Sequence, residues 1–172
     1  MATGFAACRK IHCSDFPVPL KEAYCPYTTG DLIKFTNHNN DTLALNVKSD
    51  FIDNTPPFRS NCKCACGAHA SFETAKNSVY SLQITGGIDW FVGERAPNFC
   101  YLNCYFYGDE SADAFRIIKE NVVDDSEYTI FGDTVFIEKE DNERISSVKI
   151  IKNKGIVEFW DKKYECNWTR VE

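Results

Sequence analysis

From residue 30 onward the chain alternates between hydrophobic and polar positions, the pattern of half-buried β-strands. Short alternating runs recur, and residues that favour turns separate them, among them Asn39-Asn40 and Gly108-Asp109. The hydrophobic positions of the runs are Ile33 and Phe35; Leu43, Leu45 and Val47; Tyr80, Leu82 and Ile84; Cys100, Leu102, Cys104 and Phe106; Val135 and Ile137; Val148 and Ile150; Val157 and Phe159; and Tyr164, Cys166 and Trp168. Such spacing predicts an all-β domain, either an antiparallel β-sandwich or a barrel-like meander.

Some segments between these runs carry less regular patterns. Residues 62–74 are expected to form a further strand after the break at Pro56-Pro57. Gly86-Gly87 predicts a bulge or turn that interrupts its strand. Residues 112–123 fit a helical face, but their β-branched pairs favour a strand, which we expect. Gly155 is expected to take a positive φ in the hairpin turn that follows residue 152.

The N-terminal part of the chain lacks sustained periodicity. Its prolines, Pro17, Pro19 and Pro26, predict an extended leader. We therefore assign residues 1–23 to a residual signal, a lipobox and a linker, and residues 24–172 to a single all-β domain. A chain of 172 residues is near the usual size of one hydrophobic core.

Composition excludes two classes of protein. The net charge is -6 and the basic residues are scattered, whereas a nucleic-acid-binding protein carries a basic stripe. No apolar run approaches the ~20 residues that a membrane-spanning helix requires. The hydrophobic share of 44% is sufficient for a packed core and argues against a disordered chain.

Nine cysteines give the strongest chemical signal. Cys8 follows Phe5-Ala6-Ala7, which has the form of a bacterial lipobox, and we expect Cys8 to carry a lipid. The remaining eight are an even number and predict a disulfide scaffold in an oxidising compartment. The disulfide candidates are Cys13, Cys25, Cys62, Cys64, Cys66, Cys100, Cys104 and Cys166. Bonds within one strand are disfavoured because neighbouring thiols on one face do not converge, and many connectivities remain open.

A metal site is the alternative use of these thiols. Cys62, Cys64, Cys66 and His69 have the spacing of soft ligands for zinc or copper(I). There is no second cysteine pair at zinc-ribbon spacing, and an oxidising compartment competes for the thiols. We therefore favour the disulfides and expect neither a metal nor a cofactor.

Catalytic motifs are absent from the sequence. It contains no nucleophile elbow, no zinc-protease motif and no phosphate loop. Asp89-Trp90-Phe91 could stack on a sugar or a peptide, but we expect both rings in the core. A non-catalytic binding or scaffolding module is therefore favoured over an enzyme. The alternative is a hydrolase whose two carboxylates meet only in the folded protein.

The chain resembles the small, uncharacterised lipoproteins of Bacteroidota. The resemblance rests on loose motifs over most of the chain, namely Phe5-Ala6-Ala7-Cys8, Tyr24-Cys25-Pro26-Tyr27 before Gly30-Asp31, Gly132-Asp133-Thr134, and Arg144 to Val148 running through Lys154 to Phe159 and on to Trp168. It implies a cleaved signal, a lipidated cysteine and a β-rich domain in the cell envelope.

The expected partners follow from this resemblance and from the lipobox. They are the membrane, through a lipid on Cys8, and an unknown envelope protein or glycan. Arg9 and Lys10 follow Cys8, where surface-exposed members tend to carry acidic residues, so we expect the periplasmic side rather than the cell surface.

Overall fold

The computed structural model describes residues 14–54, 64–93, 96–119 and 128–172. In chain order its elements are α1 (Val18–Tyr24), β1 (Leu32–Thr36), β2 (Thr42–Asp53), β3 (Cys64–Thr74), β4 (Gln83–Gly93), β5 (Ala96–Tyr107), β6 (Ala112–Lys119), β7 (Tyr128–Phe131), β8 (Thr134–Glu138), β9 (Ile145–Ile151), β10 (Gly155–Asp161) and β11 (Cys166–Val171). The strands form one eleven-stranded antiparallel sheet in the order β6-β5-β4-β3-β2-β1-β11-β10-β9-β8-β7.

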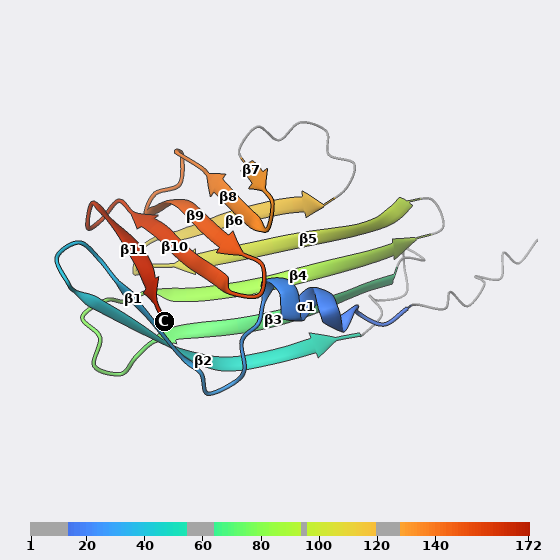
Figure 1. The fold of residues 1–172 in the computed structure, drawn as a ribbon, viewed down its shortest axis with the longest axis horizontal. Coiled ribbons are helices and arrows are strands. Elements are labelled where there is room, and N and C mark those ends of the chain that lie inside the picture. The colour runs from blue at the N-terminus through green and yellow to red at the C-terminus, as the bar shows by residue number, and fades with distance from the viewer. Residues whose placement is uncertain (1–13, 55–63, 94–95, 120–127) are drawn as a thin grey trace, which may run out of the picture.

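Consecutive strands pair with one another, except that β6 and β7 lie at opposite edges of the sheet and β1 pairs with β11. That pairing joins two meanders, β1–β6 and β7–β11. Figure 1 shows the second meander folded across the long strands of the first, so the sheet is nearly closed and barrel-like. The prediction of an all-β, barrel-like meander is confirmed.

Polar contacts hold β6 against the second meander. The buried carboxylate of Asp113 on β6 accepts hydrogen bonds from the backbone N–H groups of Glu143, Arg144 and Ile145 at 2.6–3.0 Å. Arg144 also donates to the carbonyl oxygen of Ser81 in the first meander at 3.1 Å, and within the second meander it forms a buried ion pair with Asp161 at 3.0 Å. A buried carboxylate is costly unless its oxygens are satisfied, and here both acids are.

The N-terminal segment packs with one face against the barrel core, where an extended leader was expected. Residues 18–24 form α1, and Phe16 and Ala23 are buried in the same core as the sheet residues. The packed unit therefore extends beyond the expected boundary at residue 24. Pro17 and Pro19 misled the prediction because proline is tolerated before and within the first helical turn, where no intrahelical N–H bond is lost.

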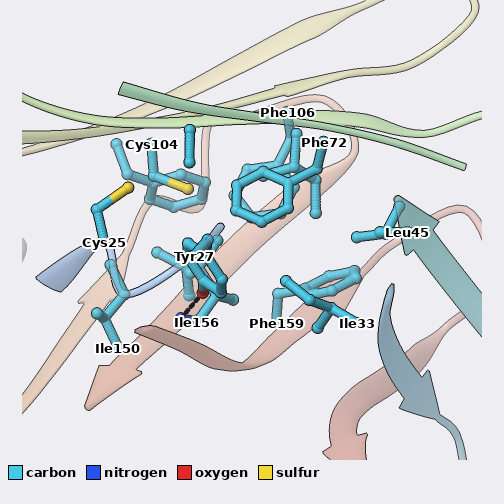
Figure 2. Close-up of a cluster of buried hydrophobic side chains, with 14 of the residues drawn as sticks. Cys25, Tyr27, Ile33, Leu45, Phe72, Cys104, Phe106, Ile150, Ile156 and Phe159 are labelled. Carbon is cyan, nitrogen blue, oxygen red and sulfur yellow. Dashed lines mark hydrogen bonds between the residues drawn. The ribbon is translucent and has the colours of Figure 1, made fainter. Parts of the chain in front are cut away.

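Small residues on the inner face of the sheet make room for this segment. Ala70 on β3 and Gly86 on β4 are cross-strand partners with their inner face toward the core. Cys25 and Tyr27 pack there, and the ring of Tyr27 meets Phe72 edge-on at 4.5 Å (Figure 2). The N-terminal segment thus contributes side chains to the core inside the barrel.

The glycine pair at 86–87 does not interrupt its strand, so the predicted bulge or turn is wrong. β4 keeps a continuous register with both neighbours through Gly86 and Gly87. Both glycines serve packing: Gly86 faces Phe72, and a Cβ on Gly87 would lie 2.7 Å from Nδ1 of His69. Glycine within a strand also marks such close approaches.

Other predictions have mixed outcomes. Residues 112–119 are the strand β6, as expected, and residues 120–123 lie outside the described residues. Gly155 has φ +74°, as predicted. Val157 does not share the core face with Phe159, because a register shift between Ile156 and Glu158 puts Ile156 there instead. Pro56-Pro57 lies outside the described residues.

Candidate functional site

A groove of about 300 Å³ lies on the outer face of β8–β11, on the side of the sheet away from the hydrophobic core. Two aromatic side chains, Phe136 and Trp160, line it together with three glutamates, Glu138, Glu140 and Glu158. Trp160 is 37% exposed, which is unusual for tryptophan in a well-packed domain. Ser146, Ser147 and Asn167 supply hydroxyl and amide groups at the same groove.

Strand register brings these side chains together. One row across the sheet runs from Glu138 to Ser147, Trp160 and Asn167, which are cross-strand partners on β8, β9, β10 and β11. Side chains alternate along a strand, so Glu158 lies on the same outer face as Trp160, and Phe136 on the same face as Glu138. The neighbouring row runs from Phe136 through Lys149 to Glu158. The groove therefore rests on four paired strands.

The charge in the groove is predominantly negative. In the part of the chain that the structure describes, none of the three glutamate carboxylates takes part in an ion pair. Lys149 is the cross-strand partner of both Phe136 and Glu158, and Lys162 donates to the backbone carbonyl of Glu140 at 2.5 Å. Three carboxylates thus outnumber the two flanking ammonium groups.

This combination of groups suits a positively charged ligand. Carboxylates attract ammonium and guanidinium groups, and an exposed tryptophan ring attracts a cation through its π face. The serine and asparagine side chains can orient such a ligand through hydrogen bonds. A lone acidic cluster would be a solvated surface; the enclosing groove and the two rings distinguish this one.

A second polar cluster covers the outer face of β3–β6. Asn103 donates to Asp89 at 2.6 Å and accepts from Arg116 at 2.8 Å, and it is buried although it faces outward. The guanidinium of Arg116 lies over the ring of Tyr101 at 5.5 Å. His69 lies above Gly67 and Gly87 in the same region. Asp89, Asn103 and Arg116 satisfy one another's hydrogen bonds across the strands, which is typical of a structural cross-strand ladder.

The structure describes four of the predicted disulfide cysteines, and all four are buried free thiols: Cys25, Cys66, Cys104 and Cys166. Burial raises the pKa of Cys25 to about 12 and also raises the pKa of Cys104. The predicted lipidation site Cys8, together with Cys13 and Cys62, lies outside the described residues. Cys64 and Cys100 are placed only by the backbone of β3 and β5.

The metal alternative is not supported by the residues that the structure describes. Cys66 faces the core, whereas His69 is an odd number of positions away on the same strand and faces outward. No group of three or more candidate ligands forms a metal site among the described residues.

Trp90 of the predicted aromatic pair packs against the core, as expected, and Phe91 is placed only by its backbone.

Sequence reasoning did not identify the groove. Its signal was present, because Glu138, Glu158 and Trp160 occupy the polar face of predicted strands, but exposed acids usually mark a solvated surface.

No helix in the described ranges is both long and apolar enough to cross a bilayer. Comparison with protein-family models, curated proteins and solved structures finds no match.

Proposed function

We propose that this chain is a non-catalytic binding module of the cell envelope whose groove receives a basic segment of a partner protein. The observation that carries the proposal is the set of three carboxylates without ion-pair partners among the described residues, beside the exposed ring of Trp160. A lysine or arginine side chain complements both features. A neutral ligand would leave the carboxylates without the positive charge they favour.

The energetics point to a segment rather than a single cation. Each exposed ion pair contributes about 0.2–1 kcal/mol, and an exposed cation–π contact contributes about 0.5–1 kcal/mol. One ammonium group therefore binds weakly. In an extended segment alternate side chains lie ~6.6 Å apart on one face, so basic residues at every second position could reach several carboxylates at once.

The proposal includes attachment of the module to a membrane. Cys8 would become the lipidated N-terminus, and its two acyl chains would give stable anchoring on the periplasmic side. Expressed from the full gene in its host, the protein should incorporate a palmitate analogue and partition with membranes. A Cys8→Ala variant should lose both properties, and unchanged labelling of that variant would contradict the anchor.

Binding should depend on the groove residues and on salt. Calorimetric titration with a short peptide of alternating lysine and serine should give measurable heat at low salt, and it should weaken at 0.5 M salt. Glu158→Gln and Trp160→Ala should each lower the affinity about two- to fivefold. Lys149→Ala should raise it, because the competing ammonium group beside Glu158 is removed.

Two controls make this measurement decisive. Glu110→Gln removes an exposed carboxylate outside the groove and should leave the affinity unchanged. A matched peptide of alternating glutamate and serine should not bind. Equal losses in Glu110→Gln and Glu158→Gln would show that only net charge matters and would overturn the assignment of the groove.

A hydrolase is the second candidate, favoured by the presence of three carboxylates in one groove. Glycoside hydrolysis needs two carboxyl groups about 5–9.5 Å apart, one of them acting as the acid. Turnover of a glycan by the wild-type protein, abolished in Glu138→Gln or Glu158→Gln, would replace the binding proposal. Absence of turnover with retained peptide binding supports the module.

A further inference from the structure

Two buried cysteines from distant parts of the chain lie together inside the barrel. Cys25 follows α1 in the N-terminal segment, and Cys104 lies in the middle of β5; each is 2% exposed. Figure 2 shows their sulfur atoms directed toward one another. The Sγ atom of Cys25 is 3.9 Å from the carbonyl oxygen of Gly86, and Gly86 is the cross-strand partner of Cys104.

We propose that Cys25 and Cys104 form a disulfide that fixes the N-terminal segment to the inner wall of the barrel. The two thiols come from different elements, so they escape the geometric objection to bonds within one strand. The other two described cysteines have different surroundings. Cys66 Sγ lies 4.0 Å from the carbonyl oxygen of Ser14, and Cys166 accepts a hydrogen bond from Asn37 at 3.6 Å.

The surroundings of the pair suit a structural crosslink. Ala70 and Gly86 present no bulky side chain beside Cys25, so a bond would leave the packing of the wall intact. The N-terminal segment is already held by further contacts: Tyr27 accepts from the Ile156 N–H at 2.6 Å, and Lys21 pairs with Asp50 at 3.1 Å. A disulfide would add a covalent link to a segment that packing has already positioned.

Formation of the bond requires an oxidant, for which a small-molecule disulfide suffices. One cysteine thiolate attacks this disulfide, forms a mixed disulfide and releases one thiol of the oxidant. The second thiolate attacks the cysteine sulfur of the mixed disulfide and releases the other thiol. The two cysteines lose two protons and two electrons, and the oxidant is reduced to two thiols.

Burial determines when this exchange can occur. Desolvation raises the pKa of both thiols, so the reactive thiolate is scarce once the segment has packed. The bond should therefore form rapidly during refolding, before the interior closes. In the folded reduced protein the same oxidant should act at least tenfold more slowly.

The test uses the full chain, reduced and then refolded in a buffer of oxidised and reduced glutathione. Free thiols are blocked after denaturation without reduction, and the protein is digested and mapped by mass spectrometry. A crosslinked peptide joining Cys25 to Cys104 is the expected result. Recovery of both cysteines as blocked thiols, or of either one joined to another cysteine, would overturn the proposal.

Thermal unfolding gives a second readout. Reduction should lower the melting temperature of the oxidised protein by about 5–15 °C. In Cys25→Ala and in Cys104→Ala, the fall in melting temperature on reduction should be smaller, because only other crosslinks can contribute to it. Cys166→Ala also removes a buried thiol but should retain the full Cys25–Cys104 contribution. Equal shifts in the wild-type protein and the Cys25→Ala variant would contradict a crosslink through Cys25.

Discussion

Tyr27 illustrates how one side chain joins the N-terminal segment to the barrel. Its hydroxyl oxygen accepts from the Ile156 N–H at 2.6 Å, and its ring packs edge-on against Phe72. Gly155 lies directly against this hydroxyl, and a Cβ at that position would overlap the phenol oxygen. Gly155 also has φ +74°, a conformation that residues with a Cβ rarely adopt.

A substitution at Gly155 should therefore carry two costs. Gly155→Ala should lower the free energy of unfolding by about 3 kcal/mol, part from the positive φ and part from displacing Tyr27. Gly132→Ala is the matched control, because Gly132 has φ +58° but open space around its Cβ position, and it should cost only about 1 kcal/mol. Urea unfolding measures both, and equal costs would contradict the packing described for Tyr27.

At the scale of elements, α1 is attached to β2 through a polar contact. Asp50 on β2 accepts from the Thr29 N–H at 2.7 Å and from the Thr29 hydroxyl, and it pairs with Lys21 of α1 at 3.1 Å. The hydrogen bonds from Thr29, followed by the contact with Lys21, lower the pKa of Asp50 to about 2. The carboxylate is thus favoured in the folded state.

This contact predicts a pH dependence of stability. Because the folded pKa lies below the unfolded value of 3.8, the contribution is complete above about pH 4 and is lost as the pH falls toward 2. Solvent exposure limits it to about 1–2 kcal/mol. Asp50→Asn should flatten the unfolding profile between pH 4 and pH 2, and Lys21→Met should flatten it less. An unchanged profile in Asp50→Asn would contradict the contact.

The elements also show what sequence patterns can and cannot predict. Alternation identified β1 and β2 because Ile33, Leu43 and Leu45 face one core with polar residues between them. It missed α1, since seven residues with two prolines nearby carry almost no periodic signal. The glycine pair also led to a wrong prediction of a bulge or turn at Gly86, because Gly86 makes room for Cys25, which comes from a distant segment.

The groove was harder to predict from the sequence than the strands or α1. Its side chains were on the expected outer faces of their strands, but they form rows only in one register, and the shift between Ile156 and Glu158 is not visible in the sequence. The groove also requires that β8 to β11 pair in chain order. Local patterns specify which residues face outward; pairing decides which of them meet.

Across the whole molecule, the two faces of the sheet have different uses. On the inner face, the N-terminal residues Phe16, Cys25 and Tyr27 pack in the same hydrophobic core as the strands. Asp113 accepts from the Arg144 N–H, and the Arg144 guanidinium donates to the Ser81 carbonyl oxygen, so these contacts hold the two meanders together. The outer face of β8–β11 presents the acidic, aromatic groove, which we propose to be the binding site.

Trp160 provides the most direct test of that claim. The chain has three tryptophans, so a two-dimensional ¹H–¹⁵N NMR spectrum should show three indole signals, and Trp160→Phe identifies one of them. On titration with the lysine–serine peptide, the Trp160 signal should shift in a saturable way, whereas that of the fully buried Trp168 should not. Binding of the peptide without any shift of the Trp160 signal, or no binding at low salt, would contradict the account.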